Sequence, residues 1–143
     1  MADVVTPYPL KDIEPELDGL RKYWASLIRG NNEMPFWDDL KPSAVAQLSS
    51  RLVILEVFDK PNRFRYSGLL GDELLDRYGE DVRDMFLHET ARRAPFDFLE
   101  SQAEATVESA KPTYYRAGDY SRILLPMWGD GRIGMLLGAV VWR

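Results

Sequence analysis

His88 is the only histidine of the chain, and the sequence contains no cysteine. Nucleophilic catalysis with a histidine base would therefore have to use His88. Metal centres usually combine two or more imidazole or thiolate ligands, which this composition cannot supply. We predict no metal site and no catalytic residue, and we interpret His88 as a surface or capping histidine beside Asp84 or Glu89.

Carboxylates occur in adjacent pairs, which could act as general acid and base if they were partly buried. The pairs Asp38-Asp39, Asp72-Glu73 and Glu80-Asp81 fall beside predicted turns or helix starts. Acidic side chains at such positions usually cap helices and interact with solvent. The sequence therefore favours a protein that is not an enzyme. The alternative is a small α+β enzyme with a carboxylate general base in an apolar pocket.

Five strands are predicted, two near the middle of the chain and three at its end. Leu52–Phe58 and Arg132–Trp142 are apolar on both faces, which is typical of central strands that are covered on each side. Arg63–Ser67 alternates between arginine and aromatic side chains, which indicates an edge position. Lys111–Arg116 and Tyr120–Trp128 complete the set. Helical segments separate the two groups, so we predict an α+β domain.

Three details near the end of the chain predict local structure. A helix is expected over Phe96–Ala110, where it stops before Pro112. Pro126 cannot donate to a ladder, so we expect a bulge or an unpaired point there. Gly134 and Gly138 share one face of their strand, which permits the close approach of a helix or a ligand.

An N-terminal helix is predicted over residues 12–29, because apolar residues recur there at spacings of three and four. This stripe can pack on the domain's own sheet, it can form a dimer contact between paired helices, or it can do both at once. The predicted homodimer interface consists of Ile13, Leu17, Leu20, Trp24 and Leu27. Residues 1–11 are expected to form a flexible leader, since Pro7 and Pro9 disfavour regular structure.

The composition describes one globular domain of 143 residues, of which 45% are hydrophobic. The net charge of −5 argues against a nucleic-acid partner. The first residues lack the features of a secretion signal, and the longest apolar stretch is too short to span a bilayer as a helix. We therefore expect no membrane partner. A chain without cysteine suits the reducing cytoplasm.

Several packing and turn motifs follow one another in a characteristic order. They are Leu20-Arg21-Lys22-Tyr23-Trp24, Leu52–Val57, Phe64-Arg65-Tyr66, Gly71 with Tyr78-Gly79-Glu80-Asp81-Val82, Tyr120–Met127, Asp130-Gly131 and Leu137-Gly138. Through these motifs the chain resembles the PAS superfamily over residues 20–141. More narrowly, it looks like short bacterial stand-alone proteins with a PAS-like fold.

The resemblance implies a five-stranded antiparallel sheet with the strand order 2-1-5-4-3, helices on one face and an N-terminal capping helix. Some PAS domains hold haem through one histidine in the zone where His88 lies. We do not expect His88 to be a haem ligand, and the sequence assigns no cofactor.

The resemblance also implies a cavity between the sheet and the middle helices. Its candidate lining residues are Tyr66, Phe86, Phe98, Gln102, Tyr115, Leu125 and Met135. Buried tyrosine hydroxyls and a glutamine need hydrogen-bond partners, which a ligand could supply. The alternative is an aromatic core that is filled and satisfied by local hydrogen bonds.

We expect a non-enzymatic PAS-like sensory or regulatory module in a single domain over residues 12–143. It would bind a small ligand, a signalling protein partner, or both, and it would signal through its N-terminal helix. A ligand-free protein-interaction module is a further alternative, and exposed apolar patches around Phe36-Trp37 or Trp142 would favour it.

Overall fold

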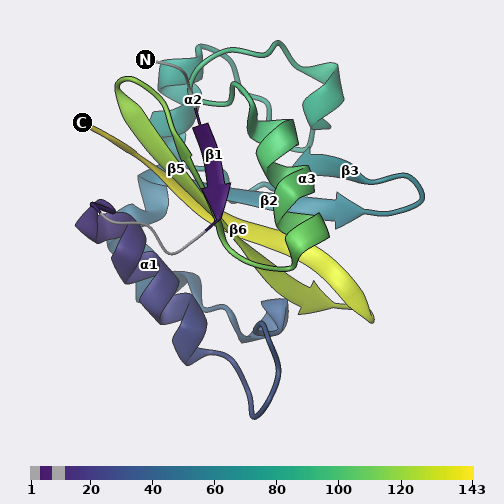
Figure 1. Ribbon diagram of the computed structural model, residues 1–143. Coiled ribbons are helices and arrows are strands. Elements are labelled where there is room, and N and C mark those ends of the chain that lie inside the picture. Colours follow the sequence, from purple (N-terminus) through teal and green to yellow (C-terminus); the bar gives the residue numbers. More distant parts are fainter. Residues whose placement is uncertain (1–3, 8–11) are drawn as a thin grey trace.

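A computed structural model of the protein describes residues 4–7 and 12–143, and its strands form one antiparallel sheet (Figure 1). The sheet has six strands in the order β1-β4-β5-β6-β2-β3. The strands are β1 (Val4–Pro7), β2 (Leu52–Phe58), β3 (Arg63–Tyr66), β4 (Thr113–Arg116), β5 (Tyr120–Gly129) and β6 (Arg132–Trp142). The five predicted strands are confirmed, and their order 2-1-5-4-3 corresponds to β3-β2-β6-β5-β4.

β1 is the element that the sequence did not indicate. Val4–Pro7 pairs antiparallel with β4 in the register Val4 to Arg116 and Pro7 to Thr113. The expectation that residues 1–11 lack regular structure is therefore wrong for Val4–Pro7. A proline is compatible with an edge strand, because there its missing N–H need not contribute to a ladder. The remainder of the predicted leader lies outside the described residues.

β2 and β6 are the central strands, as their apolar residues predict. They pair from Leu52 opposite Ala139 to Glu56 opposite Met135. β5 pairs with β6 along almost its whole length, with one irregularity between Met127 and Trp128. This bulge lies just beyond Pro126, where a bulge was expected.

In the part of the chain that the structure describes, three α-helices and three 3₁₀ segments cover this sheet (Figure 1). The α-helices are α1 (Pro15–Ser26), α2 (Asp72–Tyr78) and α3 (Leu99–Ser109), and the 3₁₀ segments are η1 (Trp37–Asp39), η2 (Pro42–Arg51) and η3 (Leu87–Glu89). α1 and α3 are both shorter than the predicted ranges 12–29 and 96–110. None of the helices in the described part of the chain is long and apolar enough to cross a membrane.

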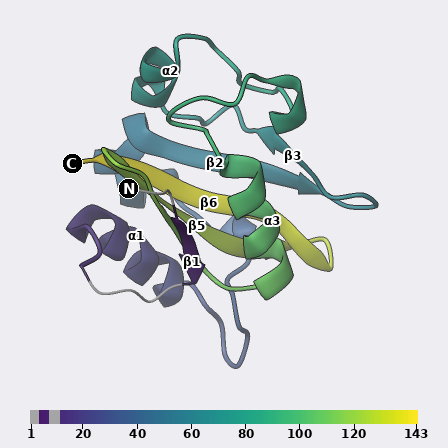
Figure 2. The same cartoon turned by 45° about the horizontal axis from the view of Figure 1, so that its top comes forward.

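The helices divide between the two faces of the sheet, so the molecule has two apolar cores. On one face, α2 and α3 pack on β-strand residues such as Val53, Leu136 and Val140. On the other face, α1 and η2 pack on residues such as Ile54 and Leu137. Figure 2 shows α1 and α2 on opposite sides of β2 and β6.

The apolar stripe of α1 is buried by the chain's own sheet. Leu17, Leu20 and Trp24 are all within the second core, and Nε1 of Trp24 donates a 2.8 Å hydrogen bond to the carbonyl oxygen of Pro126. These three residues therefore cannot form the predicted dimer interface while α1 stays on the sheet. Ile13 and Leu27 are half-buried against the same core. The stripe follows the first of the two interpretations, which is packing within the domain.

Candidate functional site

Arg122 is the most unusual residue of the fold, because its guanidinium is completely buried between β5 and α3. Nε donates to Oε1 of Gln102 at 2.7 Å. The two terminal nitrogens donate to the carbonyl oxygens of Pro95 at 2.8 Å and Asp97 at 3.0 Å. The guanidinium carbon also lies 4.5 Å from the ring centre of Tyr115. A buried charge needs such partners, since unpaired it would destabilise the fold by several kcal/mol.

Burial lowers the pKa of Arg122 to about 10, although Tyr115 and Asp97 favour its charged form. The guanidinium therefore remains protonated at neutral pH. Its charge lies beside Asp97, whose carboxylate also accepts a short hydrogen bond from the hydroxyl of Tyr120. The fully buried Arg122 and the half-buried Asp97 thus belong to a polar cluster within the core, together with Gln102, Thr106 and Thr113.

Arg122 fixes the segment that leads into α3. Its hydrogen bonds to the carbonyls of Pro95 and Asp97 hold this segment against the sheet. Phe98 follows directly, and its backbone is left-handed with φ of 59°. A bulky residue rarely adopts this conformation, which costs about 1–3 kcal/mol and persists only where the surroundings impose it. The side chain of Phe98 nevertheless remains 56% exposed.

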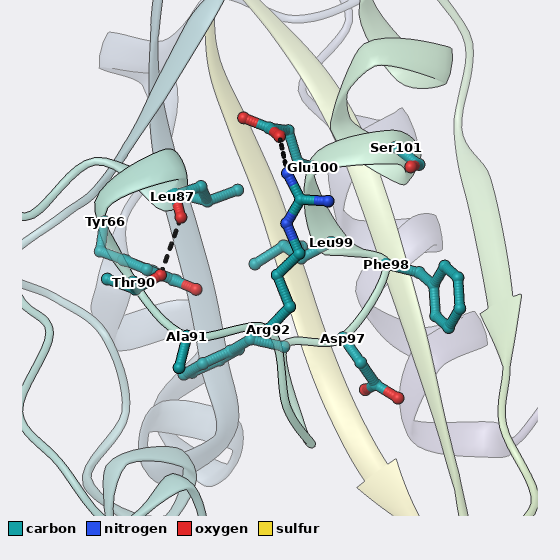
Figure 3. Close-up of a pocket in the computed structure, with 11 residues that line it drawn as sticks. Tyr66, Leu87, Thr90, Ala91, Arg92, Asp97, Phe98, Leu99, Glu100 and Ser101 are labelled. Atoms are coloured by element: carbon teal, nitrogen blue, oxygen red, sulfur yellow. Dashed lines mark hydrogen bonds and ion pairs between the residues drawn. The ribbon is translucent and has the colours of Figure 1, made fainter.

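Phe98 stands at the edge of a cavity of about 240 Å³ in front of the start of α3. Figure 3 shows this cavity between the segment around Thr90 and the first turn of α3. Its apolar walls come from Tyr66, Leu87, Phe96 and Leu99, and its polar groups come from Thr90, Asp97, Glu100 and Ser101. The rings of Tyr66 and Phe96 lie 5.0 Å apart in a tilted arrangement.

An ion pair crosses this cavity. Figure 3 shows Arg92 extending from the segment that precedes α3 to Glu100 on the helix, where Nη2 lies 3.3 Å from Oε1. The Arg92 side chain is 78% exposed, so the pair contributes about 0–1 kcal/mol to stability. A ligand with either sign of charge could therefore replace one partner of this pair at little cost.

The structure divides the seven predicted pocket residues into four groups, three of which lie on the face that carries α3 or at its edge. Tyr66 and Phe98 line the cavity. Gln102 and Tyr115 lie beneath it, where both contact Arg122. Phe86 packs 5.5 Å from the ring of Phe58, outside the cavity lining.

Two of the predicted pocket residues are on the wrong face of the sheet. Leu125 and Met135 belong to the core beneath α1. Side chains alternate along a strand, so Leu124 and Leu136 point towards α3 instead. The assignment of Leu125 and Met135 to the pocket is therefore a one-residue error in the phase of β5 and β6.

Sequence reasoning did not single out Arg122, Asp97 or Phe96. One signal was available for Arg122, because it is the only charged residue between Tyr120 and Met127 and directly precedes an apolar run. A charged residue within a central strand has two explanations. Either one face of the sheet is exposed to solvent, or the charged side chain is buried and has hydrogen-bond or ionic partners.

His88 lies outside the cavity lining and is exposed, with its ring 5.5 Å from that of Phe86. This position agrees with a surface histidine. Within residues 4–7 and 12–143, no group of three His, Cys, Asp or Glu side chains could hold a metal ion.

A second polar network occupies the opposite face, beside α1. Glu14 accepts a 2.5 Å hydrogen bond from the hydroxyl of Tyr114 and a 3.1 Å contact from Arg143. The Tyr114 hydroxyl also lies 2.8 Å from Oγ of Ser121. Burial alone would raise the pKa of Glu14, but hydrogen bonds from Ser121, Tyr114 and Arg143 outweigh it, so the pKa is lowered.

The two networks lie back to back across the sheet. Tyr114 and Ser121 are the immediate chain neighbours of Tyr115 and Arg122, and the alternation of a strand directs them to the other face. A shift of β4 or β5 that accommodates a change at Arg122 would therefore also move the partners of Glu14.

No protein-family model, curated protein or solved structure matches this chain significantly, so the comparisons assign no family.

Proposed function

We propose that this protein is a PAS-like, non-enzymatic regulatory module that binds a small ligand in the cavity in front of α3. The cavity with its exposed, left-handed Phe98 is the observation that carries this proposal. The ring of Phe98 is 56% exposed although it lies 5.9 Å from the ring of the buried Tyr115, and backbone strain of this kind is concentrated at binding sites. The strand order agrees with the PAS resemblance.

The lining restricts the chemistry of the ligand. At about 240 Å³ the cavity lies just below the range of about 300–1,000 Å³ for drug-sized ligands, so a molecule with one or two rings fits best. Aromatic walls favour a flat apolar body. The polar groups of Asp97, Glu100 and Arg92 favour a polar substituent at the open end of the cavity.

We further propose that the occupied cavity acts on α1 through β4 and β5. A ligand that displaces Phe98 or Asp97 would change the hydrogen bonds of Arg122, which lie under the cavity. The neighbouring residues Tyr114 and Ser121 then transfer that change to Glu14, which immediately precedes α1. The expected response is a shift in the population of two packings of α1 on the sheet.

Two further points belong to this proposal. A cysteine-free chain fits a cytoplasmic module, and we propose that compartment. A homodimer would need a surface other than the buried stripe of α1.

The geometry offers less support for the alternative of an enzyme. A carboxylate general base in an apolar pocket needs a raised pKa. The pKa of Glu14 is shifted, but downwards, and Glu14 lies on the face opposite the cavity.

A fragment screen by ligand-observed NMR tests the ligand site. Ala91 is an exposed cavity residue, so Ala91→Trp should fill the cavity without unfolding the protein. Ala46→Trp, on η2, is the matched control. We expect ring-containing fragments to bind the wild type and Ala46→Trp but not Ala91→Trp. Equal binding to all three proteins would contradict the proposed site. Amide exchange of α1 with a bound fragment then tests the response of the helix.

A further inference from the structure

The side chain of Arg92 lies across the cavity in front of α3. Figure 3 shows it reaching from the segment before α3 to Glu100, where Nη2 lies 3.3 Å from Oε1. Arg92 and Glu100 both line the cavity. An arginine side chain combines an apolar stem with a cationic end. The protein therefore holds a positively charged group of its own against Glu100.

The two partners of this ion pair differ in their exposure to solvent. The side chain of Arg92 is 78% exposed, whereas that of Glu100 is 33% exposed. A ligand of either charge can break the pair at little cost, but the partner that it leaves behind carries the ligand's own charge. An anion on Arg92 would leave the partly buried carboxylate of Glu100 close by, where solvent screens their repulsion poorly. A cation on Glu100 releases Arg92, which can turn into water. The pair therefore favours a cationic ligand over an anionic one.

The other charges around the cavity agree with this preference. Among the described residues that line it, Asp97 is a second carboxylate and is half-buried. Arg122 lies beneath the cavity, and each of its three guanidinium nitrogens already donates to a protein acceptor. The N-terminus of α3 favours a negative charge, which Glu100 supplies in the first turn. A ligand therefore meets two carboxylates and one displaceable cation.

We propose that the cavity binds a small arylalkylamine, whose protonated nitrogen replaces the guanidinium of Arg92 on Glu100. The ring of the ligand packs on the aromatic wall of Tyr66 and Phe96, and such rings also attract a nearby cation. Arg92 is then an internal competitor that occupies Glu100 in the absence of a ligand. This inference rests on the proposed ligand site and names the chemical class of its ligand.

The test compares three probes that carry the same ring but differ in charge, namely phenethylamine, 2-phenylethanol and 3-phenylpropionate. Their dissociation constants for the full chain are measured by ligand-observed NMR titration at neutral pH. We expect the amine to bind the wild type about fivefold more tightly than the alcohol, and the carboxylate to bind most weakly. The uncharged alcohol reports on the cavity itself, so Ala91→Trp should bind none of the three probes.

Two substitutions should change the ratio of amine affinity to alcohol affinity in opposite directions. Glu100→Gln removes the carboxylate and should lower this ratio about fivefold. Arg92→Ala removes the competing cation and should raise it about threefold. Glu16→Gln removes an exposed carboxylate of α1, on the other face of the sheet, and controls for the general negative charge of the protein. It should leave the ratio unchanged, and circular dichroism melts confirm that each variant folds.

The outcomes that contradict this inference differ from those that contradict the ligand site. Equal binding of amine and alcohol to the wild type, tighter binding of the carboxylate, or an unchanged ratio in Glu100→Gln would overturn the assignment of an amine while the cavity remains a binding site. Binding of none of the probes to the wild type, or equal binding to Ala91→Trp, would overturn the ligand site and this inference together.

Discussion

Nε of Arg122 donates a 2.7 Å hydrogen bond to Oε1 of Gln102, and this contact joins the sheet to α3 beneath the cavity. The amide nitrogen of Gln102 lies 3.3 Å from the carbonyl oxygen of Thr113 and 3.2 Å from that of Arg122. Gln102 therefore connects α3 to both β4 and β5. These groups are buried and cannot bind water instead. Most other arrangements of the Gln102 and Arg122 side chains would therefore leave a donor or an acceptor without a hydrogen-bond partner.

Replacing Arg122 by methionine should strongly destabilise the protein. The change leaves Oε1 of Gln102 and the carbonyls of Pro95 and Asp97 without their donor. We expect the free energy of unfolding in urea to fall by about 3 kcal/mol. Arg116→Met, which removes an exposed arginine of β4, should change it by about 0.5 kcal/mol or less. Equal losses in the two variants would show that the buried contacts of Arg122 contribute nothing specific.

Phe98→Gly should separate stability from ligand binding. Glycine adopts the left-handed backbone without strain, and this gain offsets the lost contact between the exposed ring and that of Tyr115, 5.9 Å away. We expect unchanged or slightly increased stability, within about 1 kcal/mol, together with weaker binding of cavity fragments. Phe96→Ala removes the buried neighbour and should cost about 3–5 kcal/mol. A comparable loss in Phe98→Gly would mean that Phe98 is a structural residue.

Glu14 should stabilise the protein in a pH-dependent manner. Its pKa is lowered from a usual value of 4.5, so the folded state binds fewer protons than the unfolded state. The stabilisation is therefore complete above pH 4.5 and is lost as the pH falls through the lower, folded pKa. We expect Glu14→Gln to be less stable by about 1–2 kcal/mol at pH 7.

A urea series from pH 7 down to acid measures this dependence. The difference between wild type and Glu14→Gln should shrink only once the pH is below 4.5. Glu16→Gln, an exposed carboxylate of the same helix, should follow the wild type at every pH. A constant difference across the series would refute the assigned role of ionised Glu14.

Gly138→Ala should disrupt the pairing of the two longest strands. A Cβ atom at Gly138 would lie 2.7 Å from Cδ2 of Leu124 and closer still to the carbonyl oxygen of Ile123. We expect a loss of about 1–3 kcal/mol in thermal or urea unfolding. At Gly118 an added Cβ meets nothing within 4 Å, so Gly118→Ala is the control and should be close to neutral. The same destabilisation in both variants would contradict this close approach.

The fold could be predicted from the sequence where hydrophobic patterns are unambiguous. β2 and β6 are apolar on both faces, and this alone places them in the centre of the sheet. The same property conceals which face of each strand points towards α3. A strand without a polar face gives no sign of which alternate side chains point to which side of the sheet. That is why Met135 on β6 is assigned to the wrong face. Leu125 shares the error because β5 is apolar on both faces from Ile123 to Met127. The sequence predicted that Gly138 allows a close approach, but the neighbour is strand β5 rather than a helix or a ligand.

The centre of the site could not be predicted from local pattern. Arg122 can be buried because acceptors from residues 95, 97 and 102 surround its guanidinium. These acceptors lie up to 27 positions from Arg122 in the sequence, so a local pattern does not reveal them. The strand at Val4–Pro7 depends in the same way on the distant partner β4. The exposure of Phe98 follows from a backbone conformation that its residue type does not indicate.

The central claim, a ligand cavity in front of α3, is tested most directly by native mass spectrometry of protein purified without denaturation. Wild type, Ala91→Trp and the control Ala46→Trp would be compared after identical preparation. We predict extra mass from a retained small molecule on the wild type and on Ala46→Trp, and the polypeptide mass alone for Ala91→Trp. The polypeptide mass for all three proteins, or the same extra mass on Ala91→Trp, would contradict the assignment of this cavity as a ligand site.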